Sequence, residues 1–331
     1  MRTALCDMLG IDIPIVLAPM GVAVGPRLAA AVSNAGGLGA LPVWRADIDK
    51  VRQLIRVTKS LTSRPFAVNL NLDFPQEERL EVCLQEGVPV ISFFWGDPAA
   101  LVSQAKTGGA IVMHSVGTAS DALAAVECGV DIIVAQGWEA GGHVWGTVAT
   151  LPLVPAVVDA VPSVPVVAAG GIADGRGLAA VLALGASGAW IGTRFLASDE
   201  AEIHPHFRAR LLNASENDTV HLDSLFDITW PNAAHRVLRN KTVTEWEKAG
   251  KPRAGHRPGE GEVVAVSQSV GPLVRYRCYT PGIDVEGDIE AMSLWAGQGV
   301  GLVKRQQPAA SIVRKICSEA EAILKRLARC E

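Results

Sequence analysis

The chain has 331 residues, of which 49% are hydrophobic, and a formal net charge of -4. No clustered basic run is present, which argues against a nucleic-acid partner, because a phosphate backbone requires an electropositive protein face. No uncharged apolar run reaches the roughly 20 residues that cross a bilayer, and residues 1–7 lack the basic-then-apolar form of a signal peptide. With six isolated cysteines and no CxxC spacing, these features predict a cytoplasmic protein that does not enter membranes.

Eight short apolar runs recur along the first two thirds of the chain, each followed by a stretch with helical character. The runs cover residues 15–18, 37–41, 66–70, 88–93, 110–113, 131–135, 164–168 and 189–192. Their starts lie about 20 to 35 residues apart, the length of one strand-plus-helix unit. They do not alternate between polar and apolar residues, which is typical of parallel strands buried on both faces. The pattern predicts an α/β protein with a (β/α)₈ TIM barrel. An open doubly wound sheet is the alternative, and it usually has fewer strands.

The pattern changes after the eighth run. Residues 199–310 are richer in charge, Trp and Pro, and the Gly/Pro/Arg stretch at 250–261 is predicted to be an exposed loop. Residues 311–327 then return to helical periodicity. We therefore expect a barrel built from residues 1–198 plus 311–331. Residues 199–310 form an insertion or lid segment near the substrate site, folded against one end of the barrel.

Residues suited to binding a flat ligand follow the first and third runs, at the end of the barrel where ligands bind. Pro19, Met20 and Gly21 come directly after the first run; the proline fixes the backbone and the glycine permits a close approach. An ordinary loop is the alternative for this motif by itself. Asn69, in the third run, offers an amide donor and an acceptor at one position.

The loops after the seventh and eighth runs have the composition of a phosphate site. Gly170 and Gly171 follow the seventh run, and Gly192 and Thr193 follow the eighth. Glycines expose backbone N–H groups, a helix N-terminus favours an anion, and the threonine adds a hydroxyl donor. Because these two loops form the recurring phosphate site of such barrels, the sequence predicts that a phosphate binds there.

The loop after the sixth run carries the candidate catalytic residue. Gln136 stands at the strand tip, where its amide can meet a ligand, and Gly141 and Gly142 place His143 on a turn with little bulk around it. A lone histidine is more often structural, but a position beside a predicted phosphate site favours a role in proton transfer. Glu139 is either a partner of this histidine or a solvated loop carboxylate, and the second interpretation is preferred.

The remaining histidines are given smaller roles. His114 follows the fifth run and either points into the site or caps a neighbouring element. His204 and His206 have no third ligand at a suitable spacing, so no metal site is predicted. The histidines of the insertion are interpreted as surface residues: His221, His235 and His256.

Together these blocks resemble the nitronate monooxygenase family, formerly called 2-nitropropane dioxygenases. The resemblance covers nearly all of residues 1–198 and also touches 296–299, and the Gln-Gly-x-Glu-Ala-Gly-Gly-His block at 136–143 is its most specific part. The other matching blocks are Ala18-Pro19-Met20, Asn69, Ala169-Gly170-Gly171-Ile172 and Gly192-Thr193-Arg194-Phe195.

The resemblance implies a TIM barrel that binds FMN non-covalently. The residues implied to line the isoalloxazine ring or ribityl chain are Pro19, Met20, Gly21, Asn69, Gln136, Gly141 and Gly142. Those implied at the phosphate are Gly171, Gly192 and Thr193, and Gly170 beside them is also expected to bind the cofactor. Ser115 stands near the flavin where the family often has Gln or Lys, so how the flavin's redox potential is set stays open.

The resemblance also implies a reaction. His143 matches the family's catalytic base, which takes the proton alpha to a nitro group. The resulting nitronate passes electrons to FMN, and O₂ completes a monooxygenation to a carbonyl compound and nitrite.

Two other functions remain open at this point. Related flavin enzymes with similar loops take hydride from NAD(P)H and reduce a quinone or an enoyl thioester, so fold and cofactor do not settle the substrate. A non-enzymatic barrel that binds FMN or another phosphate ligand is the third option. Barrels of this kind often dimerise, so a homodimer is considered, and no nucleic-acid or membrane partner is expected.

Overall fold

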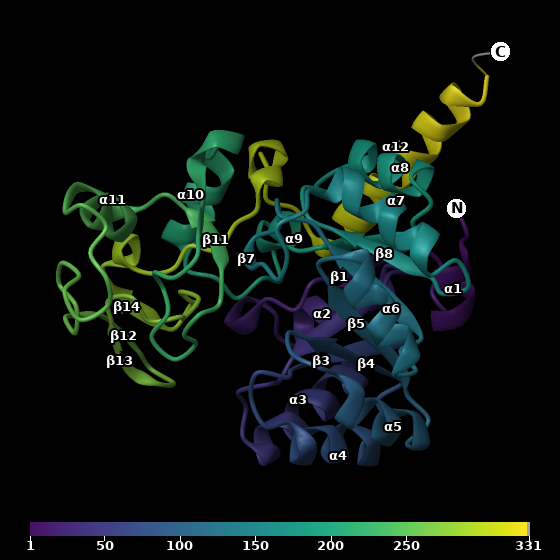
Figure 1. Ribbon diagram of the computed structural model, residues 1–331, viewed down its shortest axis with the longest axis horizontal. Helices are drawn as coiled ribbons and strands as arrows, with labels where there is room; N and C mark the ends of the chain where they lie inside the picture. Colours follow the sequence, from purple (N-terminus) through teal and green to yellow (C-terminus); the bar gives the residue numbers. More distant parts are fainter. Residues whose placement is uncertain (330–331) are drawn as a thin grey trace.

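The computed structural model describes residues 1–329, and its larger part is a barrel of eight parallel strands (Figure 1). The strands are hydrogen-bonded in the order β1-β9-β8-β6-β5-β4-β3-β2, and a parallel bridge between Val16 and Leu38 joins the two ends. Their bounds are Ile15–Leu17 (β1), Gly39–Pro42 (β2), Phe66–Asn71 (β3), Val90–Phe94 (β4), Ile111–Val116 (β5), Ile132–Gln136 (β6), Val166–Ala169 (β8) and Gly188–Ile191 (β9). Each of the eight predicted runs overlaps one of these strands, so the TIM-barrel prediction is confirmed.

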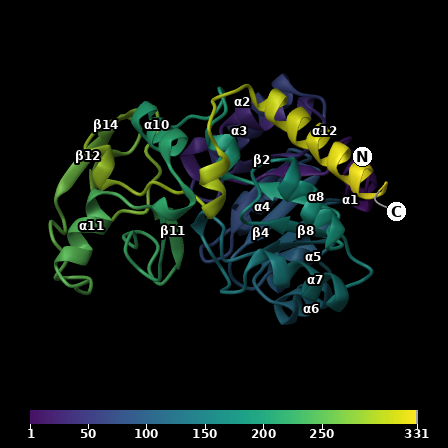
Figure 2. The same ribbon diagram turned by 90° about the horizontal axis from the view of Figure 1, so that it is seen from above.

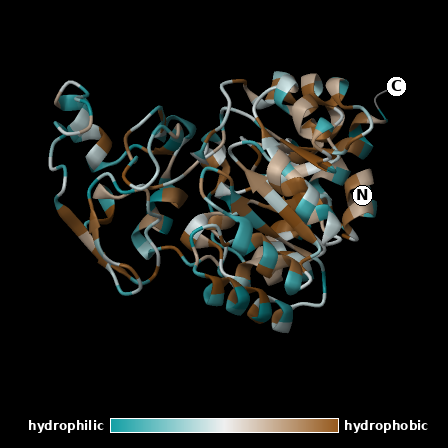
Figure 3. Ribbon diagram, turned by 60° about the horizontal axis from the view of Figure 1, so that its bottom comes forward, coloured by the Kyte–Doolittle hydropathy of each residue, from teal (hydrophilic) through white to brown (hydrophobic). Residues whose placement is uncertain are grey.

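The strands are apolar throughout because both of their faces are buried. Alternate residues belong to different cores: Val16 and Val134 lie in the inner cluster of the barrel, whereas Ile15, Leu17 and Ile133 pack in the outer cluster against the helices. Helix α1 (Ala4–Leu9) contributes Leu5 and Leu9 to the inner cluster. Figure 3 shows the apolar strands surrounded by helices whose outward faces are hydrophilic.

The helices follow the strands in the expected order. Their bounds are Pro26–Asn34 (α2), Ile48–Leu61 (α3), Glu77–Gln85 (α4), Ala99–Thr107 (α5), Ala119–Glu127 (α6), Thr150–Ala160 (α7), Gly175–Ala183 (α8) and Thr193–Leu196 (α9). Helix α12 (Ala309–Leu327) returns to the barrel and packs along α8 and α2 (Figure 2). The contact with α8 is close, since a Cβ on Gly175 would lie 2.3 Å from the Glu319 Cβ.

Residues 199–308, which we call the cap, form a smaller part beside the barrel (Figure 1). Its helices are Pro205–Asn213 (α10) and Lys241–Lys248 (α11), and its strands are Thr219–Leu222 (β10), His235–Leu238 (β11), Val263–Ser267 (β12), Gly271–Val274 (β13) and Val285–Gly287 (β14). Short 3₁₀ turns cover Gly21–Ala23, Glu216–Asp218, Ile289–Ala291 and Gln298–Leu302. The loop at 250–261 is irregular and mostly exposed as predicted, but its Arg257 is buried.

The cap contains two small antiparallel sheets, ordered β10-β11-β7 and β13-β12-β14. Strand β7 (Gly142–His143) belongs to the barrel's loop after β6, so this loop completes a sheet of the cap. Among residues 1–329, no helix combines the length and the apolarity that a bilayer span requires.

Candidate active site

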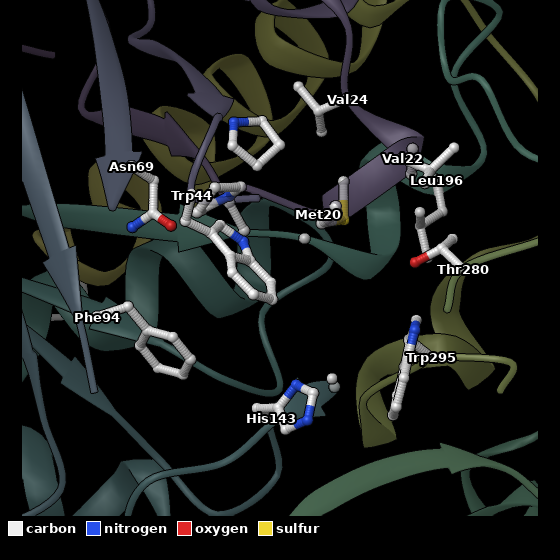
Figure 4. A pocket seen from close by; sticks show the side chains of 18 of the residues that line it. Met20, Val22, Val24, Trp44, Asn69, Phe94, His143, Leu196, Thr280 and Trp295 are labelled. Atoms are coloured by element: carbon white, nitrogen blue, oxygen red, sulfur yellow. The ribbon is translucent and has the colours of Figure 1, made fainter. Parts of the chain in front are cut away.

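A cavity of about 1040 Å³ lies where the carboxyl ends of the barrel strands meet the cap (Figure 4). It brings together all the residues that the sequence singled out for catalysis or cofactor binding: Pro19, Met20, Gly21, Asn69, Ser115, Gln136, Gly141, Gly142, His143, Gly170, Gly171, Gly192 and Thr193. Their roles remain predictions, but their convergence from six strands and the loops that follow them agrees with the expected position of a barrel ligand.

Several of these glycines permit contacts that a side chain would block. A Cβ on Gly141 would lie 2.3 Å from the Gly297 backbone nitrogen, and one on Gly192 would lie 3.3 Å from the Met20 Sδ. Gly170 and Gly171 have φ of 106° and 71°, the left-handed region that favours glycine. The loops after β8 and β9 therefore border the cavity with backbone instead of side chains.

The segment 296–299 of the cap closes the cavity beside these loops. Gly297 N donates to the Thr193 Oγ1 at 3.0 Å, and Gln298 N donates to the Glu139 carbonyl at 3.0 Å. The Thr193 hydroxyl accepts this bond, so its own hydrogen is still available to donate to a ligand. Gly297 and Gly299 also line the cavity.

Two asparagines of β3 supply amide groups to the cavity. Asn69 and Asn71 are two residues apart and so lie on the same face of the strand. The Asn69 Nδ2 donates to Ser92, at 3.2 Å to the carbonyl and 3.3 Å to the hydroxyl. The Asn71 Nδ2 is buried and has no partner within the described chain. Buried donors are normally satisfied, so this amide marks a place for a ligand acceptor, and the sequence analysis did not select it.

The loop that carries His143 is held by both parts of the molecule. Gln136 Nε2 donates to the His143 carbonyl at 3.0 Å, and Gln136 Oε1 accepts from Trp145 N at 2.9 Å. On the cap side, His143 pairs with His235 across the β7–β11 ladder. Gln136 therefore lines the cavity as predicted, but both groups of its amide position the histidine loop.

The His143 imidazole lies among aromatic rings and beside a thiol. Its ring centroid is 3.8 Å from that of Trp230 and 5.2 Å from that of Trp295, and its Nε2 is 3.8 Å from the Cys278 Sγ. Burial, followed by the charges of His235 and Arg45, lowers the pKa of His143 well below its ordinary value of 6.5. The imidazole is therefore neutral near pH 7 and can accept a proton. Figure 4 shows it facing the cavity, between Phe94 and Trp295.

The structure corrects two interpretations of other histidines. His235 is not a surface residue: it is fully buried in β11, with its ring 5.8 Å from that of His143. Its Nδ1 bonds the Ala233 carbonyl at 2.8 Å and its Nε2 accepts from Phe226 N at 3.3 Å, which fixes a neutral tautomer. His114 lies within β5 instead of after it, and the cavity is lined by the next residue, Ser115.

Glu139 is not a partner of His143, and its half-buried carboxylate is hydrogen-bonded to the protein. Its Oε2 accepts from Thr150 N at 2.9 Å and from Thr150 Oγ1 at 3.0 Å, at the start of α7. The carboxylate thus binds the N-terminal end of a helix. Within residues 1–329, no cluster of His, Cys, Asp and Glu could hold a metal ion.

Sequence reasoning missed most of the aromatic wall of the cavity. Trp44 follows β2, Phe94 is the last residue of β4, and Trp230 and Trp295 come from separate segments of the cap. Of the two cap tryptophans, Trp230 is only 2% exposed. The positions of Trp44 and Phe94 at the carboxyl ends of strands were a usable signal.

Comparison with known proteins adds to this picture. The sequence model described as nitronate monooxygenase matches residues 2–78 and 71–319. The chain is 39% identical over 256 residues to a (3aS,4S,5R,7aS)-5-hydroxy-7a-methyl-1-oxo-octahydro-1H-indene-4-carboxyl-CoA dehydrogenase of Mycobacterium tuberculosis, covering 76% of this chain and 70% of the relative. It is 30% identical over 377 residues to a nitronate monooxygenase of Paraburkholderia phytofirmans, covering 98% and 97%.

Two solved structures share the whole fold. FabK from Thermotoga maritima superposes with a TM-score of 0.84 at 34% identity, covering 99% of both chains. A nitroalkane oxidase from Streptomyces ansochromogenes superposes with a TM-score of 0.80 at 28% identity, covering 98% of this chain and 100% of the other.

Proposed function

This chain belongs to the nitronate monooxygenase family of flavin-dependent oxidoreductases, and from that premise we propose that it oxidises alkyl nitronates or nitroalkanes with bound FMN and O₂. The products are a carbonyl compound and nitrite. The observation that carries the proposal is the neutral, buried imidazole of His143 facing the cavity. A neutral imidazole can take the proton alpha to a nitro group, and the surrounding rings exclude water that would compete for it.

The polar groups and glycine loops that line the cavity suit FMN. The glycine-bordered loops after β8 and β9, together with Thr193, would hold the phosphate. The unpartnered Asn71 Nδ2 would donate to a flavin oxygen, and the carbonyl oxygen of Asn69 offers an acceptor beside it. When bound, FMN supplies the acceptor for substrate electrons and passes them to O₂.

Replacing the imidazole tests the proposed base. We expect His143→Asn to lower kcat/KM for neutral nitroethane by about 10²- to 10⁴-fold, because the proton then has no acceptor. A preformed nitronate has already lost that proton, so ethylnitronate should lose much less. The exposed His256, changed to Asn, is the matched control and should alter neither substrate. Equal losses for both substrates in His143→Asn would exclude the role of base.

A second function, the reduction of a quinone or an enoyl thioester by NAD(P)H through FMN, is favoured by one observation. The cavity of about 1040 Å³ lies at the top of the range for small-molecule sites, which leaves room for a substrate larger than a nitroalkane beside FMN. The relative at 39% identity is named for a substrate that carries coenzyme A.

Anaerobic stopped-flow reduction separates the two functions. The purified yellow protein is mixed with propionate 3-nitronate in one arm and with NADH or NADPH in the other. Bleaching of the flavin by the nitronate alone supports the first proposal, and rapid bleaching by a nicotinamide nucleotide alone selects the second. A protein that binds no FMN would contradict both.

A further inference from the structure

Arg45 lines the cavity from the barrel side and has no carboxylate partner. It follows β2, and its guanidinium donates to two backbone carbonyls of the cap, from Nη1 to Cys278 at 3.3 Å and from Nη2 to Thr229 at 3.0 Å. The guanidinium lies 4.3 Å from the ring centroid of Trp44, which supports it from one side. Arginine has more N–H donors than these two bonds use, and none of the described carboxylates lies within ion-pair distance.

Arg277 lines the same cavity from the cap side. Its Nη1 donates to the Pro272 carbonyl at 3.2 Å, and its buried Nε has no partner within residues 1–329. Arg277 directly precedes Cys278, whose carbonyl accepts from the Arg45 Nη1, so the two arginines are neighbours at the cavity. After the larger effect of burial, the charge of Arg277 also lowers the pKa of Arg45. Two neighbouring cations without a carboxylate partner suit an anionic ligand.

The carboxylates that border the cavity do not fill this place. Asp284 accepts from the hydroxyls of Ser267 and Ser269, each at 2.6 Å. Burial raises the pKa of Glu202, which lies against Gly25 instead of against the arginines.

Cys278 connects the arginine pair to the candidate base. The Cys278 carbonyl accepts from Arg45, while its Sγ lies 3.8 Å from the His143 Nε2. The backbone around the pair is also strained, since Thr229 and Tyr276 have φ of 80° and 70°. Non-glycine residues in this region cluster at functional sites, where surrounding contacts hold them.

We propose that Arg45 and Arg277 form a subsite for an oxyanion, a carboxylate or a phosphate, that the substrate carries in addition to its reacting group. The inference rests on the proposed function for the identity of the reacting group, but not for the binding of the anion. A planar guanidinium from each side of the cavity suits an oxyanion, which both can contact through charge-assisted hydrogen bonds.

A pair of substrates that differ by one carboxylate tests the subsite. Wild-type KM for propionate 3-nitronate should be at least about tenfold lower than for propyl-1-nitronate, since one charge-assisted contact is worth about a factor of ten. Arg45→Gln and Arg277→Gln should bring the ratio of the two KM values toward one, and Arg45→Lys should restore part of it. Arg314→Gln removes an exposed arginine of α12 and should leave the ratio as in the wild type.

Binding without turnover separates this inference from the proposed function. Propionate carries the carboxylate of propionate 3-nitronate but has no nitronate to oxidise. Titration with propionate, or with coenzyme A, should change the tryptophan fluorescence, because Trp44 lies under Arg45. A response to coenzyme A that Arg45→Gln abolishes identifies phosphate as the source of the oxyanion, and a response to propionate alone that Arg45→Gln abolishes identifies carboxylate. If no nitronate is oxidised but either response is lost in Arg45→Gln, the proposed function fails and the subsite stands. Equal KM values for the two nitronates, with neither titration altered in Arg45→Gln, would overturn the subsite.

Discussion

The barrel and the cap enclose one cavity, yet they are stabilised in different ways. In the barrel, strand residues alternate between two continuous apolar clusters, and ion pairs such as exposed Arg56 with Glu86 lie in the outer layer of helices. In the cap, the apolar residues are divided among small clusters, and buried arginines tie the segments together. Arg257, for example, pairs with both Asp227 and Glu260. Short irregular segments bury too little apolar surface, so they depend on specific polar partners.

Acidification should have the largest effect, and it acts on both regions. Burial lowers the pKa of His114 in the barrel and of His235 in the cap from 6.5 to about 4. As the pH falls below 6.5 the unfolded chain takes up these protons first, so stability that is complete above pH 6.5 is lost between pH 6.5 and 4. Each histidine should lower the free energy of unfolding by about 3 kcal/mol at pH 4.

Two variants assign this loss to the two regions. His114→Gln and His235→Gln each remove one titrating group, so each should flatten the pH dependence of urea unfolding between pH 6.5 and 4. The change in His114→Gln measures the contribution of the barrel histidine, and the change in His235→Gln measures that of the cap histidine. An unchanged slope in both variants would show that neither imidazole stays neutral in the folded protein.

Removing a buried arginine should show that the stability of the cap depends on ion pairs more than that of the barrel does. Arg257→Met leaves two partly buried carboxylates without their cation, and we expect a loss of about 3 kcal/mol. Arg56→Met removes a barrel cation whose side chain is 65% exposed, and should produce no measurable loss. Urea unfolding followed by tryptophan fluorescence compares the two. Equal effects would contradict the view that the cap depends on its ion pairs more than the barrel does.

Adding a methyl group at Gly141, where the barrel contacts the cap, should have a small effect on stability but should selectively weaken cofactor binding. Gly141→Ala forces the loop after β6 away from Gly297 and should cost about 1 to 3 kcal/mol. We also expect about tenfold weaker FMN binding, measured by flavin fluorescence titration.

Gly188→Ala is the matched control for this change. Its Cβ would lie 2.5 Å from the Leu5 Cδ2 and 2.8 Å from the Pro14 carbonyl oxygen, contacts that lie outside the cavity lining. It should lower stability to a similar extent without weakening FMN binding. Equal FMN affinities in the two variants would argue against the loop after β6 as part of the cofactor site.

The barrel could be predicted from the sequence because its signal is local. A run such as 131–135 is apolar on both faces, and each run is followed at once by its helix, so order and spacing specify the fold. The glycines and Asn69 were found for the same reason, since each lies in a barrel strand or in the loop after one. The family resemblance, now confirmed, rests on these same blocks.

The cap side of the site has no comparable signal. His235 stands in a segment without regular hydrophobic periodicity. Its position beside the Trp295 ring depends on the pairing of its strand with His143. Cys278 and Arg277 reach the cavity from a turn more than 130 residues away from His143 in the sequence. Their positions depend on polar contacts between distant segments, which composition and periodicity do not reveal.

Through the β7–β11 ladder, His143 is held by both the barrel and the cap. Its carbonyl is bonded to Gln136 at a barrel strand tip, and the next residue, Val144, donates to the Ala234 carbonyl of the cap at 2.8 Å. If the cap shifts relative to the barrel, His143 must lose either its hydrogen bond to Gln136 or its pairing with β11 and the ring contacts of its imidazole with Trp230 and Trp295. The proposed proton transfer therefore requires the cap and the barrel to keep this arrangement, and a ligand that separated them would displace the imidazole without contacting it.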